Sequence, residues 1–467
     1  MHRRCVLLIL LLVPLQISQC HVSDDSGLVK VEGLTPWGDW KHYHNYTEVI
    51  NTLVYLNDTY PNIVDVFTIG KSWQNRDIHC VRLTNENITH PKPKVFFVGY
   101  HHARELISSE LPLYFAVEAA TNYGKKATIT QMIDNSQIYI VVALNVDGFE
   151  AVQANEWQRK NVHPFDEDGD GLVDEDPPDD EDRDGHIEAL WERNGSVWSF
   201  IRWEGIDDDG DGLLNEDWIG GVDPNRNYGY AWNASTQSGS TNPQSETYKG
   251  PIPFSEPETQ AMRDLALQHD FKYAISFHSG IELIIYPWGY TDTLTLDDSL
   301  FREIGGNLSS AVNVPYGQSG GGLYTASGLW DDWMYGNRSA LAFTCEIYGN
   351  NDAWQYEPGP YPDSWWEKGV FQFFNPEPNK IEAVILRWLP VFTYVTNRAI
   401  TEAAAEYLKP DLNGDGIVDI LDLSLVAHSY GSHPEDDRWN EACDLNSDQV
   451  INIIDLAIVA AQYGKTA

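Results

Sequence analysis

The feature that most constrains the fold of this 467-residue chain is an alternation of short apolar runs with longer segments of helical periodicity. The runs KVFFV (94–98) and YAISFH (273–278) have the length and the β-branched or aromatic content of buried strands. Helical patterns fill residues 106–123 and 256–270, among other stretches. This alternation predicts an α/β domain in which a mixed sheet carries helices on both faces.

Polar residues with metal-binding chemistry follow these apolar runs. The run at 95–98 is followed by His102 and Glu105, His278 ends a second run, and Glu346 lies in a third. Because ligands of α/β sheets bind at the carboxyl ends of the strands, these residues are expected to converge. Two imidazoles and one carboxylate would leave an open position on zinc, and the remaining carboxylate is a candidate general base. The alternative for each motif alone is a polar helix cap or a structural histidine.

The chain is strongly acidic, and its charge is clustered. The net charge is -40; residues 166–217 hold 21 acidic and 3 basic residues, and residues 409–467 hold 11 and 3. Acidity of this strength excludes nucleic acid as a partner.

A duplicated motif explains the first acidic cluster. DEDGDGLVDED (166–176) recurs as DDDGDGLLNED (207–217), and residues 180–188 follow the same pattern more loosely. Oxygen ligands that alternate before a glycine turn allow one loop to surround Ca²⁺. We therefore expect an acidic insert, residues 163–222, that binds two or more calcium ions; a solvated acidic loop is the alternative. The candidate ligands are Asp166, Asp168, Asp170, Asp207, Asp209 and Asp211.

The C-terminal segment contains a second duplication, at 411–431 and 444–464, in which an apolar helix follows each acidic loop. Oxygen-bearing side chains occupy loop positions 1, 3, 5, 9 and 12: Asp411, Asn413, Asp415, Asp419 and Asp422, then Asp444, Asn446, Asp448, Asn452 and Asp455. The segment 409–467 resembles a dockerin domain, which implies a small all-α unit, two calcium ions and a cohesin module as partner. Many dockerins carry Ser/Thr at positions 10 and 11, where this chain has Ile420, Leu421, Ile453 and Ile454, so the partner type stays open. A self-contained calcium-stabilised tail is the alternative.

Five further motifs occur in order: HHARELISSE, GVDPNRNY, ISFHSGIELIIYPWGY, YTASGLWDDW and FTCEIY. Together they resemble the zinc carboxypeptidases of the A/B type over residues 40–399, and we expect the catalytic domain at 38–404. The resemblance implies that His102, Glu105 and His278 hold one catalytic zinc ion. It also implies that Glu346 is the general base and that Arg159 stabilises the oxyanion.

The same resemblance implies a site for the C-terminus of a substrate. Asn225 and Arg226 would bind the terminal carboxylate, Tyr324 would close over it, and Arg104 would be an auxiliary contact. Asp331 falls at the floor of the side-chain pocket, where relatives with Asp prefer Lys and Arg. If Asp331 turns away, its neighbours would instead form an apolar pocket.

Residues 1–20 have the basic start and apolar stretch of a secretory signal peptide, and no later stretch reaches membrane-spanning length. The expectation is a secreted metallocarboxypeptidase that acts on peptide and protein C-termini with basic or mixed specificity. Three alternatives remain: a hydrolase of γ-glutamyl-diaminopimelate bonds in cell-wall peptides, a deacylase of small amides, and a calcium-dependent interaction protein with an inert peptidase fold.

Overall fold

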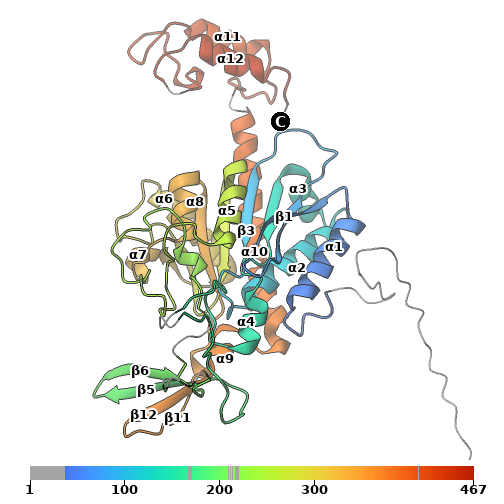
Figure 1. Cartoon of the computed structure of the whole chain (residues 1–467). Helices are drawn as coiled ribbons and strands as arrows, with labels where there is room; N and C mark the ends of the chain where they lie inside the picture. The colour runs from blue at the N-terminus through green and yellow to red at the C-terminus, as the bar shows by residue number, and fades with distance from the viewer. Residues whose placement is uncertain are drawn as a thin grey trace, which may run out of the picture.

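The computed structural model describes residues 37–166, 171–208, 210, 212, 214–215, 220–408, 410–446 and 448–466. An eight-stranded sheet, of which β1 and β3 are labelled in Figure 1, forms the centre of the larger domain. Its strand order is β1-β2-β4-β3-β7-β10-β8-β9. Strands β4, β3, β7 and β10 are mutually parallel. The pairs β1–β2, β2–β4 and β10–β8 are antiparallel, and β8 pairs parallel with β9. The strands are β1 Val64–Lys71, β2 Asp77–Leu83, β3 Lys94–Val98, β4 Gln137–Val141, β7 Phe271–His278, β8 Glu282–Tyr286, β9 Tyr316–Gln318 and β10 Leu341–Ile347.

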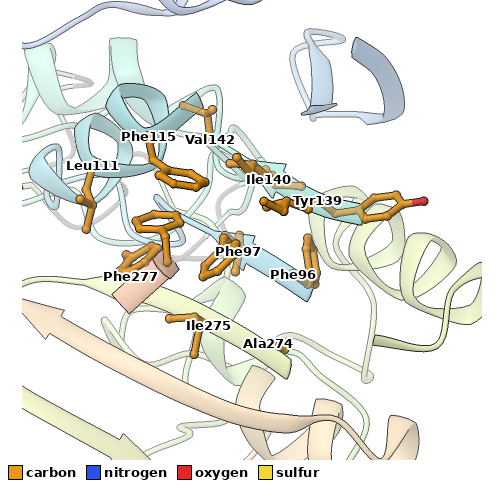
Figure 2. Packing of buried hydrophobic residues seen from close by; sticks show 14 of the residues in the cluster. Phe96, Phe97, Leu111, Phe115, Tyr139, Ile140, Val142, Ala274, Ile275 and Phe277 are labelled. Atoms are coloured by element: carbon orange, nitrogen blue, oxygen red, sulfur yellow. The ribbon is translucent and has the colours of Figure 1, made fainter. Parts of the chain in front are cut away.

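Helices cover both faces of this sheet. Two consecutive residues of β3 contact helices on opposite faces. Phe97 packs against Phe115 (Figure 2) and against Phe392, whereas Phe96 lies against Trp330. Because neighbouring side chains of a strand point to opposite faces, the helices that carry these partners cover opposite sides. The helices of this domain are α1 Tyr46–Thr59, α2 Ile107–Asn122, α3 Ala127–Asn135, α4 Gly148–Ala154, α5 Pro257–Gln268, α6 Asp298–Val312, α7 Ser319–Gly322, α8 Trp330–Arg338, α9 Val370–Phe374 and α10 Ile381–Leu408, with 3-10 turns at Pro224–Arg226, Asn351–Ala353 and Pro378–Lys380. The predicted mixed α/β fold is confirmed.

The acidic insert contains regular structure that the sequence analysis missed. Strands β5 (Ala189–Asn194) and β6 (Val197–Trp203) form a hairpin, and β5 pairs with β12 (Ser364–Lys368), which pairs with β11 (Gln355–Pro358). The resulting four-stranded sheet projects from the larger domain (Figure 1). The partner strands are remote from the hairpin in the chain, so local periodicity gave no sign of the pairing.

The C-terminal unit is helical, as expected, and has a small core of its own. Helices α11 (Ile420–Ser429) and α12 (Ile453–Ala461) each follow an acidic loop, and a 3-10 turn at Glu441–Cys443 precedes the second loop. The fully buried members of its core are Val418, Val426, Cys443, Ile451 and Val459. Both helices lie beyond the end of α10 (Figure 1).

Across the part of the chain that the structure describes, no helix is long and apolar enough to cross a membrane. The proposed signal peptide, residues 1–20, lies outside the described residues.

Candidate active site

The candidate metal ligands come together where two parallel strands end. His102 and Glu105 lie in the loop after β3, and His278 is the last residue of β7, the neighbour of β3 in the sheet. The Nδ1 atom of His102 is 2.7 Å from Glu105 Oε1 and 3.2 Å from His278 Nδ1. The Nδ1 atom of His278 is 3.0 Å from Glu105 Oε2.

The chemistry of this trio fits a zinc ion. All three residues are buried, and their ligand atoms lie within 4.8 Å of one another. Atoms bound to one tetrahedral zinc ion at about 2.0–2.2 Å are themselves roughly 3.3–3.6 Å apart. The observed separations of 2.7, 3.0 and 3.2 Å are somewhat shorter. Burial and the nearby Arg159 guanidinium lower the pKa of His102, so its imidazole is neutral and can offer a lone pair. Three protein ligands suffice, because catalytic zinc sites leave the fourth coordination position open for water or substrate.

A buried carboxylate supports the first histidine from behind. Asp223 Oδ1 is 3.1 Å from His102 Nε2, and its Oδ2 accepts a 3.0 Å hydrogen bond from Arg159 Nε. Burial alone would raise the pKa of Asp223, but Arg159 and Arg226 hold it well below its usual value. A carboxylate that binds the outer nitrogen of a metal-ligating histidine orients the ring. The sequence analysis did not single out Asp223, although it stands two residues before Asn225 in GVDPNRNY.

The other histidine of the doublet has a different environment. His101 is buried, with Nε2 3.2 Å from Tyr228 Oη and Nδ1 3.2 Å from Ser276 Oγ. It therefore neighbours the candidate metal ligands without joining them.

The candidate general base faces the cluster from the next strand. Glu346 of β10 is in register with His278 of β7 and lines the same cleft. Its Oε2 is buried and has no hydrogen-bond partner among the described residues. Burial, reinforced by the charge of Glu105, raises the pKa of Glu346 to about 7. A carboxyl with this pKa can take up and release a proton near neutral pH.

The candidate carboxylate-binding residues lie in the same cleft, which has a volume of about 260 Å³. Asn225 Nδ2 is 3.4 Å from His278 Nε2, and Arg226 is held by its own hydrogen bond to Ser238 Oγ. The Tyr324 hydroxyl is 3.4 Å from Arg226 Nη2, and this tyrosine is 40% exposed. The cleft thus has a cationic end beside the candidate metal centre.

Asp331 also lines the cleft. Its Oδ1 accepts a hydrogen bond from the Asp332 backbone at 3.0 Å, and its Oδ2 accepts one from Thr344 Oγ1 at 3.4 Å. None of the ion pairs found in the described part of the chain involves Asp331. Burial raises its pKa to about 6. The pocket therefore contains a carboxylate that a cationic substrate side chain could neutralise.

Arg104 lies outside this cleft, in an adjoining cavity. It donates to Glu246 Oε1 and Oε2 at 2.7 and 3.2 Å, and its guanidinium lies 4.5 Å from the centre of the Phe374 ring. Phe374 also bounds the space at Gly280, because a Cβ at Gly280 would meet the Phe374 ring at 2.9 Å. An aromatic ring from α9 therefore occupies space that the glycine leaves free.

The acidic loops share one hydrogen-bond pattern. In each, the carboxylate at position 1 accepts from the backbone N–H at position 6, at 2.8–3.1 Å: Asp166–Gly171, Asp180–Gly185, Asp207–Gly212, Asp411–Gly416 and Asp444–Gln449. Every position-6 residue has positive φ, from 64° to 99°. This is the sharp turn that a calcium loop requires. Asp168, Asp170, Asp209 and Asp211 lie outside the described residues.

The two C-terminal loops match each other closely. Asp422 and Asp455, at position 12, are fully buried, and each accepts hydrogen bonds from three backbone N–H groups of its loop. Asn413 and Asn446 each donate to the aspartate at position 5, Asp415 or Asp448, at 2.8 Å. The residues at position 9, Asp419 and Asn452, cap the following helices. Positions 10 and 11 carry exposed aliphatic side chains: Ile420 (61%), Leu421 (52%), Ile453 (64%) and Ile454 (50%).

Two histidines and one glutamate at strand ends, with a buried free carboxylate opposite, define a metallohydrolase of α/β fold. The family model for zinc carboxypeptidases matches residues 49–385, and the chain belongs to this family of metallocarboxypeptidases. The model for dockerin type I domains, a calcium-binding class, matches residues 409–462.

Individual relatives agree with this assignment. Carboxypeptidase B of Astacus astacus is 29% identical over 320 residues, which cover 66% of this chain and 87% of the relative. Carboxypeptidase A1 of Rattus norvegicus is 25% identical over 314 residues, covering 65% of this chain and 62%, less than two thirds, of the relative. Among solved structures, carboxypeptidase A from Helicoverpa armigera (TM-score 0.57, 22% identity, 80% of this chain and 78% of that chain) and thrombin-activatable fibrinolysis inhibitor (TM-score 0.57, 20% identity, 78% and 75%) share the fold.

Proposed function

We propose that this protein is a zinc-dependent carboxypeptidase that removes the C-terminal residue of peptides and proteins, with a preference for Lys and Arg. The observation that carries the proposal is one cleft that contains the His102–Glu105–His278 trio, the free carboxylate of Glu346 and the carboxylate-binding pair Asn225–Arg226. Amino-acid release from peptides should disappear after zinc removal and return when zinc is added back. Release that survives complete zinc removal would contradict the proposal.

The residues of the cleft have distinct roles in this proposal. When bound, the zinc ion would polarise the scissile carbonyl and acidify a water molecule. Glu346 accepts the proton of the attacking water, and Arg159 donates hydrogen bonds to the oxyanion that develops. Arg226 and Asn225 bind the terminal α-carboxylate, which favours an exopeptidase over a small-amide deacylase.

Specificity for basic residues rests on Asp331. A lysine or arginine side chain would pair with this buried carboxylate and offset its desolvation penalty. The test compares kcat/KM for peptides that end in Arg, Leu and Phe, before and after Asp331→Asn. The Arg-to-Leu ratio should fall by about tenfold or more, which corresponds to roughly 1.4 kcal/mol. A change smaller than about threefold would contradict the assignment.

Asp332→Asn is the matched control. This neighbouring carboxylate is also buried, but it accepts from the backbone of Gly289 and Tyr290 and does not line the cleft. Its replacement should leave the Arg-to-Leu ratio at the wild-type value.

We further propose that the C-terminal unit binds two calcium ions and attaches the enzyme to a cohesin module. Its exposed aliphatic pairs, Ile420–Leu421 and Ile453–Ile454, support an apolar contact surface. The double substitution of Ile420 and Ile453 by Ser should abolish capture of the chain by immobilised cohesin modules. Tyr430→Ser, a change at the exposed end of α11, should not affect capture.

The remaining proposals concern the insert and the N-terminus. The shared turn at Gly171, Gly185 and Gly212 supports calcium binding by residues 163–222. Equilibrium dialysis should then find more than two calcium ions per chain, whereas two would assign no calcium to the insert.

The signal-like residues 1–20 support secretion, which is tested by recovering the cleaved chain from culture medium.

A further inference from the structure

A second cavity, of about 440 Å³, adjoins the catalytic cleft, and its walls are mainly aromatic. Trp191, Phe200 and Trp203 come from the β5–β6 hairpin. Phe373 and Phe374 belong to α9, and Trp354 directly follows the 3-10 turn Asn351–Ala353. We call these six residues the aromatic subsite. Phe373 and Phe374 also line the catalytic cleft, so the two spaces share a wall.

Ring contacts connect this shared wall to the hairpin without a break. Phe373 lies 4.8 Å from Trp354, Trp354 lies 5.8 Å from Trp157, and Trp157 lies 4.9 Å from Trp203, measured between ring centres. Phe200 continues the series at 5.0 Å from Trp203. The Trp157 indole also donates a 2.6 Å hydrogen bond to the Ile187 carbonyl, which anchors the approach to the hairpin. The aromatic wall is therefore held together by contacts within the chain itself.

The polar part of the cavity has no uncompensated charge among the described residues that line it. Arg104 and Glu246 form a bidentate ion pair there, and Gln244 is the remaining polar residue. A charged ligand group would gain little from this paired arrangement. By contrast, Phe200, at 43% exposed, offers apolar surface that a ligand could cover.

The upstream part of a substrate bound in the cleft would extend toward this cavity. The substrate's terminal carboxylate would lie at Arg226 and Tyr324, and the scissile carbonyl at the metal ligands. Arg104 stands two residues after His102, so the cavity begins one short loop away from the metal centre. An extended peptide advances about 3.3 Å per residue, so residues upstream of the scissile bond would reach it after only a few steps.

We propose that the aromatic subsite binds an aromatic or large apolar side chain of the substrate, two or three residues upstream of the scissile bond. This inference rests on the proposed carboxypeptidase function and extends its specificity away from the terminal residue. Half of the subsite belongs to the insert, so the insert contributes to substrate selection as well as to calcium binding.

The experiment uses the full-length zinc- and calcium-loaded chain and N-acetylated tetrapeptides that end in Arg. Ala-Phe-Ala-Arg and Phe-Ala-Ala-Arg are compared with Ala-Gly-Ala-Arg and Gly-Ala-Ala-Arg, and the readout is the Phe-to-Gly ratio of kcat/KM at each position. We expect a ratio of about tenfold at one or both positions, the usual size of apolar discrimination. Phe200→Ala should reduce this ratio to about threefold or less.

Trp198→Ala is the matched control, because Trp198 is equally exposed at 44%, lies on the same strand and does not line the cavity. It should keep the wild-type ratio. A wild-type ratio below about threefold at both positions would overturn the inference, and this comparison needs no variant. An equal loss of the ratio in both variants would also overturn it. Failure of the proposed function looks different, since no peptide of the set would then release Arg.

Discussion

At the scale of single residues, two carboxylates of one cleft show how the environment separates their roles. Asp223 is surrounded by Arg159 and Arg226 and stays ionised, whereas Glu346 is buried near another carboxylate and has a pKa of about 7. Pairs of titratable groups whose pKa values are driven apart indicate different tasks. Asp223 fits a residue that orients a metal ligand, and Glu346 fits a proton acceptor.

The first prediction tests whether Glu346 acts as the general base and does not bind zinc. Glu346→Gln removes the proton acceptor but no ligand atom of the trio, so zinc content should stay at the wild-type value. The kcat/KM should fall by about 10²–10⁴-fold, the usual contribution of general acid–base catalysis. Zinc is measured by elemental analysis, and turnover is measured on a peptide that ends in Arg. A variant with near wild-type turnover would remove Glu346 from this role.

The second prediction concerns Asp223→Asn. Loss of the charge behind His102 should weaken zinc binding by about 10–100-fold, as measured by competition with a chromogenic chelator. Asp147→Asn is the control, because Asp147 is equally buried but binds Ser72, Gln74 and Arg76 away from the cleft. If both variants bind zinc equally well, Asp223 does not support the metal site.

At the scale of elements, helix α5 carries a glutamate, Glu258, whose ionised form is disfavoured by burial. Glu258 is fully buried, its Oε2 accepts a 3.0 Å hydrogen bond from Asn161, and its Oε1 has no partner among the described residues. Burial raises the pKa of Glu258 to about 8, above its value in the unfolded chain. The folded state therefore binds more protons than the unfolded state between about pH 4.5 and pH 8, and stability falls as the pH rises through this window.

The third prediction follows from this fall in stability with rising pH. Glu258→Gln should be more stable than the wild type at pH 8, by on the order of a few kcal/mol, and the difference should shrink toward pH 5. Urea unfolding of the α/β domain at several pH values measures it. Glu256→Gln is the control, and it should destabilise the domain. His163 and Asn161 lower the pKa of Glu256, so its charge is stabilising. A pH-independent difference for Glu258→Gln would contradict the argument.

At the scale of the whole molecule, the two units differ in what holds them together. The α/β domain has an extensive aromatic and aliphatic core on both sides of its sheet. The C-terminal unit has few fully buried side chains, and residues 409–467 carry 11 acidic groups against 3 basic ones. A unit of this size rarely reaches stability by apolar burial alone. Bound calcium would offset the repulsion between its carboxylates.

The fourth prediction tests this difference. Calcium removal by chelation, followed by restoration of zinc, should unfold residues 409–467 and leave the α/β domain folded. Limited proteolysis should then yield a fragment that ends near residue 408, whereas the calcium-loaded chain should resist cleavage there. Persistence of the α11 and α12 helical signal without calcium would show that the small core suffices. Peptidase activity measured in the same samples reports separately whether the insert needs calcium.

The sequence by itself determined the features whose signals are local. The strand at 94–98 and the histidine-glutamate motif after it, the acidic loops and the helices that follow them are encoded in spacings of a few residues. Hydrophobic periodicity and glycine position act over such distances, so short windows of the chain suffice to predict these elements. The motif order then predicted the zinc carboxypeptidase family, which the family model confirms.

Only the tertiary structure decided which distant segments meet. The pairing of β5 with β12, the contact of Asp223 with His102, the Arg104–Glu246 ion pair and the aromatic subsite all join residues far apart in the chain. Such contacts depend on strand register and on the shapes of two surfaces packed together, which no short window of sequence contains. For this reason the insert could be predicted as calcium loops, whereas its hairpin and aromatic wall became apparent only in the folded chain.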